Sequence, residues 1–67
     1  MTPGKRVANR LKALRRRGGL TQEALAAKAG LSRTYVARLE TVRQDPTLAT
    51  LVKLAKALGV PVTALLE

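Results

Sequence analysis

Residues 33–41, near the middle of the chain, include side chains that can donate several hydrogen bonds at once. Read as a helix at about 100° per residue, this stretch places Val36 and Leu39 on one face, with Thr34 and Arg38 on the opposite face. Arg33 stands in the first turn, from which its long side chain reaches forward. A guanidinium group binds a phosphate, or the O6 and N7 atoms of guanine together. These residue types therefore favour recognition of a nucleic acid over bond-making chemistry.

The composition argues against most catalytic and metal chemistry. The chain has no histidine and no cysteine, which removes the commonest general base and the thiolate ligands of metals. The four acidic residues form no recognisable catalytic pair: Glu23, Glu40, Asp45 and Glu67. We therefore expect no enzyme, no metal site and no cofactor. Tyr35 is the single aromatic residue, so a platform for stacking single-stranded bases is not expected.

The charge balance indicates a polyanionic partner. Thirteen lysines and arginines against four acids give a net charge of +9, which suits DNA; a solvated cationic surface without a specific partner is the alternative. A membrane is the other polyanion to consider, but the apolar runs are far too short to span one. The N-terminus also lacks the apolar core of an export signal. We expect a cytoplasmic, nucleoid-associated protein with no membrane association.

Cap and stop residues predict an all-α fold of four to five short helices in a single domain, residues 1–67. Thr21, Ser32 and Thr47 are N-cap types that precede apolar helical patterns. Gly30 ends the second helix in the left-handed conformation, and Gly59 ends the fourth helix. The expected helices cover residues 3–17, 22–29, 33–41 and 48–58, followed by a short turn from residue 60.

Apolar stripes on these helices predict one shared core. In the second helix Ala26 is small, which lets another helix approach closely. The expected stripe residues are Val7, Leu11 and Leu14 in the first helix, Leu25, Ala26 and Ala29 in the second, and Leu48, Leu51, Leu54, Ala55 and Leu58 in the fourth.

The segment GLTQEALAAKAGLSRTYVARLE resembles the helix-turn-helix of phage repressors, Cro proteins and many small bacterial regulators, the XRE family. The flanking segments RLKALRRRGGLTQ and PTLATLVKLAKALGVPVTALL also match, so the resemblance covers Arg10–Leu66. Ala26, Gly30, Val36 and Leu39 fall at the family's spacing. The resemblance implies a lambda-repressor-like DNA-binding domain, with the helix-turn-helix formed by the second and third helices.

Roles for individual residues follow from the resemblance. It implies sequence-specific binding of double-stranded DNA by a recognition helix, residues 33–41, in the major groove. The implied base-reading residues are Arg33, Thr34 and Arg38. The expected phosphate contacts are Gln22, Ser32, Tyr35, Arg43 and Arg10. The implied ion pair, between the first and third helices, joins Arg15 and Glu40.

Each of these roles has a simpler alternative. Well-known members of the family often carry glutamine where this chain has Arg33 and Arg38, and arginine suggests one or two G·C pairs in each half-site. Either arginine, however, could grip phosphate instead. Arg10 and Arg43 could simply be solvated, and the Arg15–Glu40 pair could be two exposed charges worth little.

The resemblance also implies a homodimer on a palindromic operator. The interface candidates are Val60, Pro61, Val62 and Leu66, with Val62 the leading exposed apolar residue; closure of the monomer core is the alternative. We expect a transcriptional regulator, most simply a repressor, with no small-molecule effector domain. An antitoxin, a protein-interaction adaptor and a restriction–modification controller are the alternatives that share this fold.

Overall fold

The computed structural model describes residues 3–41 and 45–67, which form four α-helices and one 3₁₀ turn. These elements are α1 (Pro3–Arg17), α2 (Gln22–Ala29), α3 (Arg33–Glu40), α4 (Leu48–Leu58) and η1 (Val62–Leu65). The described ranges contain no strand, and the predicted all-α fold is confirmed. None of the described helices is both long and apolar enough to cross a membrane.

Side-chain caps set where the helices begin. The Thr21 hydroxyl accepts a hydrogen bond from the Ala24 amide at 3.0 Å, and the Ser32 hydroxyl accepts one from the Tyr35 amide at 3.0 Å. Thr47 caps α4 in the same way. Each cap satisfies an amide that the first helical turn leaves without an intrahelical partner. The three predicted N-caps are therefore confirmed.

The turn between α2 and α3 depends on the backbone conformation of Gly30. Its φ is +71°, in the left-handed region, and the next amide, of Leu31, bonds to the Ala26 carbonyl at 2.8 Å. A Cβ atom at Gly30 would meet nothing within 4 Å. Glycine is therefore required here by its φ angle, and not by crowding.

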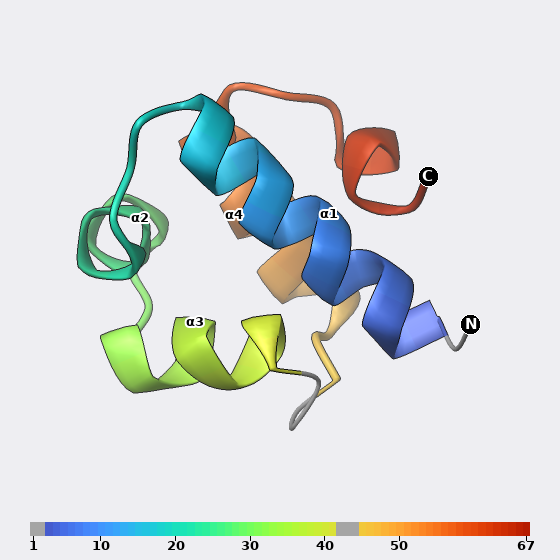
Figure 1. The fold of residues 1–67 in the computed structure, drawn as a ribbon, viewed down its shortest axis with the longest axis horizontal. Coiled ribbons are helices and arrows are strands. Elements are labelled where there is room, and N and C mark those ends of the chain that lie inside the picture. Colours follow the sequence, from blue (N-terminus) through green and yellow to red (C-terminus); the bar gives the residue numbers. More distant parts are fainter. Residues whose placement is uncertain (1–2, 42–44) are drawn as a thin grey trace.

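All five elements contribute to one core. Their largest fully buried side chains are Leu11, Leu25, Val36, Leu54 and Leu65, one from each element. Figure 1 shows α1 in front of α4, with α2 and α3 on one side and η1 near the C-terminus on the other. This packing covers the inner side of α3 and leaves its outer side open.

One residue of the predicted apolar stripe of α4 is not buried. Leu48 is 70% exposed, whereas Leu51 and Leu54 are buried. Helical angle does not explain this difference, because Ala55, seven residues later, points within about 20° of Leu48 and is buried. Leu48 is the first residue of α4, where its side chain stays largely uncovered, and its assignment to the core was wrong.

The C-terminal turn departs from the capped pattern of α2, α3 and α4. Thr2, which precedes Pro3 and is also an N-cap type by sequence, lies outside the described residues. At the other end Pro61 precedes η1 and provides no side-chain cap, and η1 is a single 3₁₀ turn. Leu65, on that turn, is fully buried and closes the core.

Candidate nucleic-acid interface

The open side of α3 carries the three residues expected to read bases. Arg33, Thr34 and Arg38 are exposed, while Val36 and Leu39 of the same helix are buried. α3 runs along the edge of the molecule (Figure 1). The hydrogen-bonding groups of these three residues thus lie on the solvent side of one helix.

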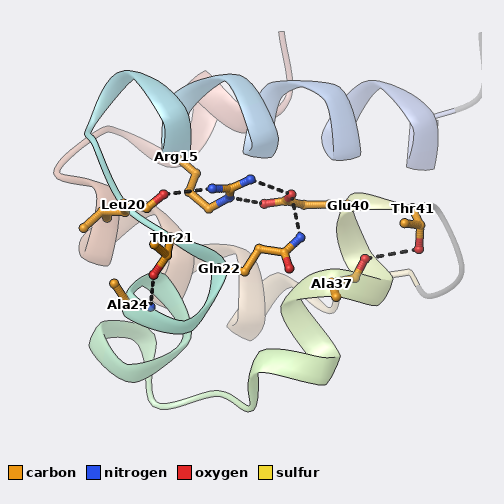
Figure 2. Close-up of polar contacts among 8 residues, drawn as sticks. All are labelled: Arg15, Leu20, Thr21, Gln22, Ala24, Ala37, Glu40 and Thr41. Carbon is orange, nitrogen blue, oxygen red and sulfur yellow. Dashed lines mark hydrogen bonds and ion pairs between the residues drawn. The ribbon is translucent and has the colours of Figure 1, made fainter.

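A buried carboxylate joins α3 to both neighbouring helices. Glu40, the last residue of α3, is 4% exposed. Its Oε2 accepts a hydrogen bond from Arg15 Nε at 2.6 Å, and its Oε1 accepts one from Arg15 Nη2 at 3.1 Å. Oε1 also accepts a hydrogen bond from Gln22 Nε2 at 3.1 Å. Figure 2 shows these side chains, from α1, α2 and α3, meeting at one point.

The guanidinium group of Arg15 links a further segment to this junction. Its Nη1 donates to the Leu20 carbonyl at 2.8 Å, in the connection between α1 and α2. The hydrogen bond and the charge of Glu40 raise the pKa of Arg15, against the opposing effect of burial. Among the described residues, no buried side-chain nitrogen or oxygen lacks a hydrogen-bond partner. The junction is thus a fully satisfied ion pair with an additional amide donor.

Three of the residues expected to contact phosphate lie on or next to α2 and α3. Ser32 is exposed, and its hydroxyl proton remains available because the oxygen only accepts from a backbone amide. Tyr35 is half-buried, with its hydroxyl 3.5 Å from Thr50 Oγ1 at the start of α4. Gln22 is half-buried and turned towards Glu40.

Arg10 has partners elsewhere. Its Nε donates to the Ala64 carbonyl at 3.0 Å, and its Nη2 lies 3.9 Å from a carboxylate oxygen of Glu67. These contacts tie α1 to the C-terminal turn, so we do not include Arg10 among the proposed phosphate contacts. Arg43 lies outside the described residues.

Two polar contacts were not foreseen from the sequence. One is the bond from Gln22 to Glu40, which joins residues 18 positions apart and leaves no local pattern. The other is the buried Thr50, whose hydroxyl accepts from Thr47 Oγ1 at 3.0 Å and lies near that of Tyr35. In the sequence, only the spacing of three residues between Thr50 and the N-cap Thr47 hinted at this contact.

Comparisons with known proteins agree with this geometry. A profile described as "Helix-turn-helix" matches residues 11–65, most of the chain. The chain belongs to the helix-turn-helix family. The resemblance found in the sequence is therefore confirmed, and the match begins within α1 and ends at η1.

Named relatives of this helix-turn-helix chain include regulators of two kinds. It is 49% identical over 59 residues to the immunity repressor protein of Bacillus phage phi105, covering 88% of this chain but 41% of the repressor. It is 42% identical over 60 residues to the control protein C.SmaI of Serratia marcescens, covering 90% and 71% of the two chains. The chain thus spans about two fifths of the length of the repressor.

A solved structure gives the same fold at nearly full length. The restriction–modification controller protein C.AhdI from Aeromonas hydrophila superposes with a TM-score of 0.90 at 37% sequence identity. The aligned part covers 92% of this chain and 94% of the controller. The helix-turn-helix chain therefore shares the fold of C.AhdI over nearly the whole length of both aligned chains.

Proposed function

We propose that this chain is a transcriptional regulator that binds double-stranded DNA in a sequence-specific manner. The observation that carries the proposal is the exposed row of Arg33, Thr34 and Arg38 on α3, in a chain of net charge +9. α3 would lie in the major groove, where base edges present distinct hydrogen-bond patterns. The named repressor and control-protein relatives support this function.

In this proposal affinity and specificity come from different groups. Phosphate contacts supply most of the affinity, and base contacts supply the sequence preference. Arg33 and Arg38 would each donate two hydrogen bonds to a guanine, while Thr34 would meet a thymine methyl group or a phosphate. Gln22, Ser32, Tyr35 and Arg43 are the proposed phosphate contacts.

We expect duplex binding to fall steeply as salt is added. Each phosphate neutralised by a lysine or arginine contributes about 0.9 to the slope of log affinity against log salt concentration. Selection of bound duplexes from a random pool should give one common site, bound at least about 10³-fold more tightly than a shuffled duplex. Fluorescence anisotropy over a salt series measures both quantities. A shuffled duplex that binds as tightly as the selected one would contradict the proposal.

A single domain of this size contacts one groove, so we propose that the chain acts as a homodimer. Half-sites about 34 Å apart would place both recognition helices on one face of the DNA. Pro61 and Leu66 are exposed, Leu66 to 45%, and remain interface candidates. Val60 and Val62 are half-buried and pack against the core, so Val62 is not the leading candidate.

Leu66→Glu is expected to convert the dimer to a monomer, because a carboxylate would be buried without a partner at the contact. Sedimentation velocity, with and without a palindromic duplex, measures the change. Leu48→Glu is the matched control, since Leu48 is 70% exposed on α4. Dissociation by the control alone would place the contact on α4. A wild-type chain that stays monomeric on the palindrome would contradict the dimer.

Control of a restriction–modification system is the second candidate role. It is favoured by the likeness to two controllers: the C.AhdI structure superposes with a TM-score of 0.90 at 37% identity, and C.SmaI is 42% identical over 60 residues. Mapping the selected binding site onto the host genome tests this role. A site upstream of a methyltransferase–endonuclease pair would support the controller, and a site within a prophage would support the repressor.

A further inference from the structure

We propose that Glu40 is a positioning residue, which holds the side-chain amide of Gln22 ready for a DNA phosphate. This inference rests on the proposed function. The observation behind it is the 3.1 Å hydrogen bond from Gln22 Nε2 to Glu40 Oε1 (Figure 2). The Arg15–Glu40 ion pair alone does not need this third side chain, because Arg15 already donates to both carboxylate oxygens.

The chemistry of the hydrogen bond between Gln22 and Glu40 fixes the orientation of the Gln22 amide. An ionised carboxylate only accepts hydrogen bonds, so it must face the NH₂ group of Gln22 and not its carbonyl oxygen. The NH₂ group carries two hydrogens, and Glu40 takes one of them. The second hydrogen remains to be donated to another acceptor. Gln22 is only half-buried, so an acceptor can approach from solvent.

The position of Gln22 suits an anion. Gln22 is the first residue of α2, where unpaired amides and the helix dipole favour negative charge. The Glu40 side chain is 1% exposed and is held by Arg15, so the acceptor that orients Gln22 is itself fixed. An amide that is already oriented loses less rotamer freedom on binding, which is worth about three- to tenfold in affinity.

Electrostatics and the positioning of Gln22 predict opposite effects of Glu40→Gln on DNA affinity. Glu40→Gln removes a negative charge from a protein that binds a polyanion, so electrostatics alone would tighten DNA binding. A glutamine side chain offers both a donor and an acceptor, so it no longer dictates which way the Gln22 amide points. Loss of positioning would therefore weaken binding. The sign of the change separates the two explanations.

A double-mutant cycle on duplex affinity tests the proposal. Wild type, Gln22→Ala, Glu40→Gln and the double variant are titrated with the selected duplex, at a temperature where circular dichroism shows each one folded. We expect Glu40→Gln to weaken binding about three- to tenfold when Gln22 is present. The same substitution should cause no loss when residue 22 is alanine, because the group being positioned is gone.

Two further variants separate positioning from stability. Glu40→Asp keeps the charge but withdraws the carboxylate by one methylene, and it replaces Glu40→Gln if that variant does not fold. Leu54→Val lowers stability from the core of α4 and should leave the affinity of the folded protein unchanged. Since the amide of Gln22 is uncharged, the salt dependence should stay the same in Gln22→Ala.

The outcomes that overturn the proposal are distinct from failure of the proposed function. Unchanged or tighter binding by Glu40→Gln in the presence of Gln22 would show that Glu40 does not position it. An equal loss in both backgrounds would show that Glu40 acts on the fold alone. Failure of the wild-type chain to bind any duplex in a salt-dependent manner would instead remove the proposed function.

Discussion

Replacing Arg15 with alanine is expected to lower the free energy of unfolding by about 3–5 kcal/mol. The substitution leaves the carboxylate of Glu40, whose side chain is 1% exposed, without its charged partner. In a domain this small each kcal/mol corresponds to a shift of about 4–8 °C in the melting temperature. Thermal unfolding followed by circular dichroism should therefore show a loss of more than about 10 °C.

Arg16→Ala is the matched control for this prediction. Arg16 lies next to Arg15 on α1 and carries the same charge, but its side chain is exposed. Its removal should change the free energy of unfolding by no more than about 0.5 kcal/mol. Equal melting temperatures for the two variants would contradict a structural role for the Arg15–Glu40 pair.

The contribution of Arg15 to stability is expected to be constant over the usual range of pH. The hydrogen bond from Arg15 to Glu40 raises the pKa of the guanidinium group in the folded state. A raised folded-state pKa gives stability that is present below the unfolded pKa and lost as the pH rises through the folded one. Both values lie in strongly alkaline solution, so the difference between wild type and Arg15→Ala should not diminish between neutral and mildly alkaline pH.

Arg33→Ala is expected to reduce discrimination at one base pair by about 1–3 kcal/mol, or roughly 5- to 150-fold in relative affinity. The reason is that a guanidinium group donating to both O6 and N7 rejects a base that cannot accept both bonds. Affinities for the selected duplex and for duplexes changed at single positions measure the effect. Arg33→Ala should bind duplexes with and without one particular G·C pair about equally. Its affinity should not simply fall by the same factor for every duplex.

Arg17→Ala controls for the loss of charge. Arg17 is exposed at the end of α1 and is not part of α3. Its removal should weaken the selected and shuffled duplexes by the same factor, because only long-range attraction is reduced. If Arg33→Ala behaves in the same way, Arg33 contributes positive charge without reading a base, and its base-reading role is wrong.

The fold was predictable because its determinants are local. Three helices are capped by the residue that precedes them, Thr21, Ser32 or Thr47. Threonine and serine before a helical pattern predict such a cap from the sequence alone. Gly30 is needed for its φ angle, which no other residue adopts as readily. The fate of Leu48 was less predictable, because burial at the first turn of α4 depends on which neighbouring elements reach that far.

The candidate site was predictable only in part. The exposure of Arg33 and Arg38 follows from helical geometry once Val36 and Leu39 are placed inside. The hydrogen-bond partner of Arg10 could not be predicted from the sequence. The Ala64 carbonyl is 54 residues away, and it comes within reach only because η1 packs on α1. Contacts of this kind depend on tertiary packing, and no spacing in the sequence encodes them.

The buried junction at the end of α3 has a kinetic consequence. Because Glu40 is bonded to both α1 and α2, α3 cannot slide along or roll against its neighbours without breaking those hydrogen bonds. If the proposed function holds, the folded chain meets DNA as a preformed body, and no slow rearrangement has to precede complex formation. Association should then be a single fast step, limited by diffusion and electrostatic attraction, and differences among operators should appear as differences in residence time.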